Sequence, residues 1–112
     1  MEDPLTLCNR FPNDELTLEK LAEEAAEIIQ AKSKIVHFGL TDTYNDTKHH
    51  PDQTNQEKLE TEIGHLLAVV DILAARGIVR YSKIHSVKEA KWDKMEKWNK
   101  YKGSITKKGE LL

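Results

Sequence analysis

The residues of this chain best suited to chemistry are acidic, and they fall into two clusters. Glu23, Glu24 and Glu27 form the first cluster, and Glu62 with His65 forms the second. Magnesium takes hard oxygen ligands, and carboxylates from two packed helices can share one ion while positions stay open for water and phosphate. Such an ion would polarise a phosphorus atom and lower the pKa of an attacking water. The two clusters therefore predict a divalent-cation site that could act on a polyphosphate.

Glu62 is the most informative of these residues because it lies within an apolar stripe. At about 100° per helical residue, one face collects the apolar side chains Leu59, Ile63, Leu66, Val70 and Leu73. Burying an ionised carboxylate is costly unless it is paired or binds a metal. Glu62 therefore predicts a positive partner across a helix interface, which could be a Lys, an Arg or a cation shared with Glu24 and Glu27.

The first acidic cluster belongs to a helix predicted from about Thr17 to Ile35. We expect its acidic side chains to lie opposite an apolar stripe made of Leu18, Leu21, Ala22, Ala25, Ile28 and Ile29. An acidic face of this kind, taken alone, is more often simply solvated. The i, i+3 spacing of Glu24 and Glu27 also lets both reach one ion, and Glu23 or a further carboxylate could orient an attacking water as general base.

Two polar segments flank this helix. Residues 1–16 contain two prolines and are expected to form an N-terminal arm. Residues 36–54 are polar and aperiodic, which predicts a long loop that could serve as a lid. The loop contains His49 and His50, which could bind a metal, but adjacent side chains on an extended segment point apart, so an ordinary pair of loop residues is favoured.

Two capping-box patterns predict where further helices start. The box at Thr54–Glu57 predicts a second helix that runs to Arg76 and ends at Gly77. The box at Ser86–Glu89 predicts a third helix, with an earlier start near Ser82 as the alternative, and this helix ends before Gly103.

The third helix is basic with interleaved aromatic residues. Trp92, Met95 and Trp98 recur on nearly one side, which favours inward packing. Its lysines fit a solvated face. The alternative is that Lys91 and Lys94 lie opposite the acidic site and hold phosphate oxygens.

Composition bounds the class of protein. A chain of 112 residues predicts one domain, here a helical domain over 17–102 followed by a tail over 103–112. The 17 basic and 19 acidic side chains nearly cancel, which gives no bias toward a nucleic acid polymer or an anionic membrane. The apolar run over 66–75 is too short to cross a bilayer. A single Cys8 and the absence of a signal-peptide pattern predict a cytoplasmic location.

The acidic clusters resemble the motifs of a known family. Glu23-Glu24-Ala25-Ala26-Glu27 and Glu62-Ile63-Gly64-His65 are similar to the EExxE and ExxD motifs of the MazG-like all-α nucleoside triphosphate pyrophosphohydrolases, and the resemblance covers residues 17–101. It implies a helical bundle of about three main helices per chain, assembled as a homodimer or tetramer. It also implies Mg²⁺-dependent cleavage of a nucleoside triphosphate between the α and β phosphorus atoms, which gives a monophosphate and pyrophosphate. By position, the metal ligands would be Glu24, Glu27 and Glu62, and the phosphate contacts Lys34, Lys91 and Lys94.

His65 departs from the family pattern, since it stands where the second motif ends in Asp. Histidine is a poor ligand for Mg²⁺ but an acceptable one for Mn²⁺ or Zn²⁺. It could therefore ligate a softer ion, act as general base, donate a hydrogen bond behind the ligands, or mark an impaired enzyme. Asp71 does not replace the missing Asp, because it lies nine residues beyond Glu62 and roughly 180° around the helix.

Three hypotheses therefore stand. The first is a nucleotide pyrophosphohydrolase that controls a nucleotide pool. The second is a catalytically silent relative that binds nucleotide, as His65 suggests. The third is a plain helical interaction module, in which Glu62 pairs with a lysine and the acidic face is solvated.

Overall fold

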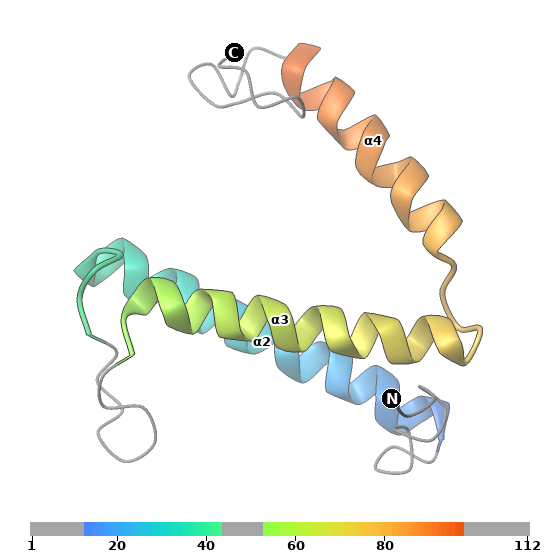
Figure 1. Ribbon diagram of the computed structural model, residues 1–112, viewed down its shortest axis with the longest axis horizontal. Helices are drawn as coiled ribbons and strands as arrows, with labels where there is room; N and C mark the ends of the chain where they lie inside the picture. Colours follow the sequence, from blue (N-terminus) through green and yellow to red (C-terminus); the bar gives the residue numbers. More distant parts are fainter. Residues whose placement is uncertain (1–12, 44–52, 98–112) are drawn as a thin grey trace. The chain divides into compact units, whose positions relative to one another are not determined.

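The computed structural model describes residues 13–43 and 53–97, which form three α-helices (Figure 1). Helix α2 spans Asp14–Phe38, α3 spans Asn55–Ala75 and α4 spans Tyr81–Lys97. Within these ranges the only β-type pairing is an isolated bridge between Thr43 and Thr54, so the all-α expectation is confirmed. The predictions for Cys8, the His49–His50 pair, Trp98 and the tail over 103–112 concern residues outside the described ranges.

Helix α2 is longer at both ends than the sequence predicted. Asn13 caps its start, because the Asn13 side chain accepts a hydrogen bond from the backbone N–H of Leu16 at 2.8 Å. Residues 14–16, assigned to the arm, therefore belong to the helix. The helix continues to Phe38, and Gly39 ends it with φ 88° while its N–H donates to the carbonyl of Ile35.

Helix α3 begins as predicted. Thr54 Oγ1 accepts from the backbone N–H of Glu57 at 3.1 Å, and the Thr54 N–H donates to the Glu57 carboxylate at 3.1 Å, which completes the capping box. The helix ends at Ala75 with Arg76 as its cap, and Gly77 follows with φ 76°. The predicted end at Gly77 is thereby confirmed.

Helix α4 does not begin at the Ser86 capping box. The carbonyl of Arg80 accepts hydrogen bonds from the N–H groups of Lys83 and Ile84, so the helix is already formed from Tyr81 and Ser86 lies inside it. The alternative start near Ser82 was the better one. Trp92 and Met95 are half-buried on this helix.

Helices α2 and α3 run antiparallel and lie side by side (Figure 1). Their buried apolar side chains are Ala31, Val69 and Leu73, and polar residues are buried beside them: Thr17, Glu24, Asn55 and Glu62. The buried positions of α2, which are 17, 24 and 31, recur every seven residues and so share one side of the helix.

This packing corrects the predicted orientation of α2. Leu18 and Ile29, expected to face the core, are 46% and 62% exposed, whereas Glu24 is buried. Leu21 and Ile28 of the same stripe are half-buried, so only part of the predicted apolar face is covered, and Glu24 is buried instead of solvated.

Both ends of the helix pair are tied together. Beside the end of α2, the backbone N–H of Asn55 donates to the carbonyl of Asp42 at 2.8 Å, and the Asn55 side chain donates to the carbonyl of Gly39 at 3.0 Å. At the opposite end, Arg76 Nε lies 3.0 Å from Asp14 Oδ1. These contacts fix the register of α2 against α3, and with it the height at which their acidic residues meet.

The chain divides into two compact units, residues 1–78 and 79–112. The first contains the α2–α3 pair and the second contains α4. In the part of the chain that the structure describes, no helix is both long enough and apolar enough to cross a membrane.

Candidate metal centre

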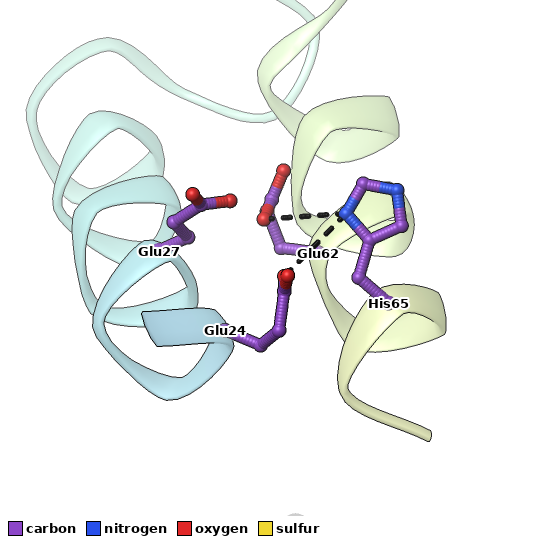
Figure 2. Close-up of side chains that lie close together, drawn as sticks. All are labelled: Glu24, Glu27, Glu62 and His65. Carbon is purple, nitrogen blue, oxygen red and sulfur yellow. Dashed lines mark ion pairs between the residues drawn. The ribbon is translucent and has the colours of Figure 1, made fainter. Parts of the chain in front are cut away.

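Four side chains from α2 and α3 converge at the contact between the two helices. Glu24 and Glu27 come from α2, Glu62 and His65 come from α3, and all four point toward a common space (Figure 2). One potential ligand atom from each lies within 4.8 Å of those of the other three. The structure thus brings together the four residues that sequence reasoning named as metal ligands.

Glu24 and Glu62 are buried and only partly satisfied. Their residues are 4% and 1% exposed. The Oε1 atom of each carboxylate has a lysine partner, since Lys20 Nζ lies 3.2 Å from Glu24 and Lys58 Nζ lies 2.9 Å from Glu62. The Oε2 atom of each is buried without a hydrogen-bond partner. A buried, unsatisfied carboxylate oxygen is costly, which makes this pair of atoms the natural place for a cation.

The lysine partner of Glu62 corrects one expectation. A positive group was predicted across the helix interface, but Lys58 lies one turn earlier on α3 itself. The i, i+4 spacing allows this contact within a single helix. Lys20 and Glu24 repeat the same spacing on α2. Both lysines were missed, although their spacing from the two glutamates is visible in the sequence.

His65 bridges the two helices at the edge of the cluster. Its Nδ1 atom lies 3.5 Å from Glu24 Oε2 and 3.7 Å from Glu62 Oε2 (Figure 2). Its side chain is 55% exposed, so the imidazole borders solvent while facing both unsatisfied oxygens. A neutral imidazole in this position could serve as a nitrogen ligand to an ion held by the carboxylates.

The Glu27 and Glu62 carboxyl groups share their electrostatic environment. A hydrogen bond with Glu62, assisted by burial, raises the pKa of Glu27 above its ordinary value. For Glu62, burial acts to raise the pKa, but hydrogen bonds from Glu27 and Lys58 outweigh it, and the pKa of Glu62 is lowered. In this arrangement Glu62 holds the negative charge and Glu27 keeps a proton more readily.

The other predicted site residues lie outside the cluster. Glu23 is exposed on α2 and pairs with Lys20 at 3.3 Å, so its role as general base stays a prediction. Lys34 is exposed on α2, and its Nζ lies 5.6 Å from the centre of the Phe38 ring. Lys91 and Lys94 are exposed on α4 in the second unit, and their role as phosphate contacts likewise stays a prediction.

Two cavities lie along the helix pair, and one of them is lined by a residue of the cluster. The first has a volume of about 180 Å³ and is lined by Glu27, Gln30, Ala31, Lys34 and Lys58. The second has a volume of about 300 Å³ and is lined by Lys34, Phe38, Asp42, Thr43 and Asn55. Glu27 of the acidic cluster lines the first cavity, and Lys34 lines both cavities.

The donor set fits a divalent cation. Three carboxylates suit Mg²⁺ or Mn²⁺, and the added imidazole favours Mn²⁺ among the two. Two helices hold these donors close together, with one potential ligand atom from each side chain within 4.8 Å of the others.

Comparison with known proteins identified no relative of this chain. No family model matches the chain, and neither a curated protein nor a solved structure is significantly similar to it.

Proposed function

We propose that this protein is a metal-dependent nucleoside triphosphate pyrophosphohydrolase that cleaves a ribo- or deoxynucleoside triphosphate to the monophosphate and pyrophosphate and so controls a nucleotide pool. One observation carries the proposal: Glu24 and Glu62 each bury an Oε2 atom without a hydrogen-bond partner, on facing helices, beside Glu27 and His65. The resemblance of both acidic motifs to the MazG-like family points to the same chemistry.

Each residue of the cluster has a part in this function. Glu24, Glu27 and Glu62 would hold Mg²⁺ or Mn²⁺, with His65 as a nitrogen ligand or as a hydrogen-bond donor that orients a carboxylate. The ion, when bound, supplies positive charge to the phosphate oxygens and acidity to a water. Glu23 lies one residue before Glu24, with its side chain largely exposed, and it is the candidate for receiving the proton of that water.

The cavities beside the cluster suit a nucleotide. Lys34 lines both of them, and an ammonium group there would attract the phosphate oxygens of a substrate whose reacting end lies at the ion. The larger cavity, beside the Phe38 ring, would then receive the nucleoside.

We further propose that the helix pair functions as a homodimer or tetramer. Among the described residues of this pair, only Ala31, Val69 and Leu73 are buried apolar side chains, a core too small to hold two helices firmly. Ile63 and Leu67 remain exposed one turn apart on α3. Between them, Gly64 has nothing within 4 Å of the place where a Cβ would be, which leaves room for a second copy to approach. A bundle formed with that copy would cover this face.

A plain helical interaction module is the second candidate, and the Lys58–Glu62 pair at 2.9 Å is the observation that favours it. If the protein is an interaction module, Lys58 would be the permanent partner of Glu62. Replacing Glu62 by Leu would then leave stability equal or improved, because a buried ion pair is often no better than apolar packing.

Metal binding and pyrophosphate release distinguish the candidates. Mn²⁺ and Mg²⁺ binding is measured by calorimetry, and pyrophosphate release is measured with a panel of ribo- and deoxynucleoside triphosphates and both ions. The variants are Glu24→Gln and Glu62→Gln, which keep side-chain volume and remove charge. Glu19→Gln and Glu60→Gln are the controls, since both residues are exposed on the same two helices and lie outside the cluster.

Metal-dependent release in the wild type and both controls, lost in the two cluster variants, would support the hydrolase. Metal and nucleotide binding without release would identify the silent relative. A wild type that binds neither ion would overturn the proposal and leave the interaction module.

A further inference from the structure

The cavity of about 300 Å³ has a wall that the start of α3 holds in place. The backbone N–H of Asn55 donates to the carbonyl of Asp42 at 2.8 Å, and the Asn55 side chain donates to the carbonyl of Gly39 at 3.0 Å. Asn55 is itself 3% exposed, so its amide is fixed. Thr43 then pairs with Thr54 in the isolated bridge. Asp42 and Thr43, which both line the cavity, therefore have backbone positions set by α3.

Asp42 brings a carboxylate to this cavity. Its Oδ1 atom accepts a hydrogen bond from the backbone N–H of Thr43 at 3.0 Å, which limits the positions of the side chain. A carboxylate can accept about four hydrogen bonds and has no hydrogen to donate. Most of its accepting capacity therefore remains for the donors of a ligand, and it offers nothing to a ligand's acceptors.

Two other side chains of the cavity suit the remaining parts of a nucleotide. The Phe38 side chain is 60% exposed, and its ring gives a base a surface for stacking. Lys34 Nζ lies 5.6 Å from the centre of that ring, and Lys34 also lines the cavity to which Glu27 of the acidic cluster belongs. A nucleotide whose base contacts Asp42 could thus direct its phosphates toward Lys34.

We propose that the cavity lined by Phe38 and Asp42 binds the nucleobase, and that Asp42 selects bases that carry an exocyclic amino group. These are cytosine, adenine and guanine, and the bases selected against are uracil, thymine and hypoxanthine. This inference rests on the proposed function and adds to it a substrate class and a specificity-determining residue that sequence reasoning did not name.

The selection follows from hydrogen-bond chemistry. An amino group donates to a carboxylate, and the pairing of Asp with the cytosine amino group is a recognised geometry. Uracil and thymine carry a carbonyl oxygen at that position, which a carboxylate repels. Their one ring N–H on the same edge is flanked by two carbonyl oxygens, so the second oxygen of Asp42 would lie against an acceptor. Stacking on Phe38 does not discriminate, because every base has a π face. The preference should therefore depend on Asp42 alone.

The test compares nucleotides that differ in the amino group. GMP carries the amino group that IMP lacks, and CMP carries an amino group where UMP has a carbonyl oxygen. These monophosphates are not consumed, and they are titrated in EDTA so that binding does not depend on the metal centre. Heteronuclear NMR spectra give the affinity and show whether the amide signals of Thr43 and Asn55 shift. We expect the amino-bearing member of each pair to bind roughly threefold to tenfold more tightly.

Asp42→Asn is the decisive variant. It keeps the shape of the side chain and an oxygen that can accept from Thr43, but it replaces the other oxygen by an amino donor. UMP should then bind at least as tightly as CMP, and the preference for GMP over IMP should fall. Both members of a pair carry the same charge, so the ratio of their affinities is insensitive to the charge that the substitution removes.

Two further variants serve as controls. Glu60→Gln also removes one negative charge from the helix pair, but Glu60 is exposed on α3 and is not among the residues that line the cavity. It should keep both preferences. Phe38→Ala should weaken all four nucleotides by roughly fivefold or more while the preferences persist, because stacking is common to all of them.

The outcomes separate this inference from the proposed function. Equal affinities within each pair, a preference that survives in Asp42→Asn, or nucleotides that leave the Thr43 and Asn55 signals unchanged would each refute the inference. Metal-dependent pyrophosphate release observed alongside any of these results would leave the hydrolase standing. A preference lost only in Asp42→Asn would establish the selection, and it would do so even in a protein that binds no Mn²⁺, where the hydrolase would fall.

Discussion

His65 Nδ1 on α3 lies 3.5 Å from Glu24 Oε2 on α2, and this contact joins the two helices at the acidic cluster. The same nitrogen lies 3.7 Å from Glu62 Oε2, so one imidazole faces both buried oxygens that lack a hydrogen-bond partner. His65, which stands in place of the Asp of the motif that the chain resembles, therefore lies at the edge of the acidic cluster. Its chemistry should decide which ion the cluster prefers.

We expect His65→Asp to raise the affinity for Mg²⁺ relative to Mn²⁺, because a carboxylate is a harder ligand than an imidazole. His65→Ala should weaken Mn²⁺ binding by roughly tenfold or more, whether the imidazole is a ligand or orients one. Calorimetric titrations with both ions measure the two affinities. His85→Asp, on exposed α4, adds the same charge as a control. An unchanged preference in His65→Asp would show that His65 does not contact the ion.

The second prediction concerns pH and Glu27. A hydrogen bond with Glu62 raises the pKa of Glu27 above its ordinary value of 4.5. Because the folded-state pKa is the higher one, this group's contribution to the stability of the metal-free fold is fully present below about pH 4.5 and is lost as the pH rises through the raised pKa. Metal binding has the opposite dependence, since the ion must displace the proton.

Thermal unfolding at a series of pH values, with and without Mn²⁺, measures both effects. We expect the stabilisation by Mn²⁺ to grow as the pH rises through the Glu27 pKa, and Glu27→Gln to remove that part of the dependence. Glu19→Gln serves as the control on the same helix. A stabilisation by Mn²⁺ that is equally large on both sides of this range would contradict the assignment of Glu27 as a ligand.

The sequence predicted the helices better than it predicted their faces. The capping box at Thr54 is a local signal, because all of its hydrogen bonds form within four residues, and the structure confirms it. The similar pattern at Ser86 failed, since the backbone was already helical from Tyr81 and a serine inside a helix cannot cap it. A capping-box pattern therefore predicts a helix start only where the residues before it are not already helical.

At the candidate site, the sequence likewise predicted the burial of one carboxylate but not of the other. Glu62 was singled out because a carboxylate within an apolar stripe must be compensated, and it is 1% exposed. The burial of Glu24 could not be predicted in the same way, because hydrophobic periodicity placed Glu24 opposite the apolar stripe and so toward solvent, whereas Leu18 and Ile29 of that stripe are exposed.

A third prediction tests how far the capping box supports the site. Thr54→Ala removes the acceptor for the Glu57 N–H and should destabilise the fold by about 1 kcal/mol. Loss of the cap would loosen the start of α3, which carries Lys58 and lies next to the second cavity. Urea unfolding followed by circular dichroism measures the change, with Thr41→Ala as an exposed control. Equal midpoints for the two variants would mean that tertiary contacts alone hold this end of α3.

The last prediction concerns the exposed apolar face of the helix pair. Leu67 is 57% exposed on α3, one turn after Ile63. If a second copy covers this face, Leu67→Glu buries a charge in the interface and should convert the oligomer to a monomer. Sedimentation velocity measures the mass, and the unfolding temperature of the wild type should rise with protein concentration.

Leu40→Glu is the matched control for this prediction, because Leu40 is comparably exposed but lies after the end of α2. It should leave the oligomer intact. Metal binding adds a second readout, because α2 and α3 of one chain supply the whole cluster. A Leu67→Glu monomer should therefore still bind Mn²⁺. Its affinity should be lower, because a less rigid helix pair would hold the ion more weakly. A wild type that sediments as a monomer at micromolar concentration would contradict self-association and leave the exposed face to another partner.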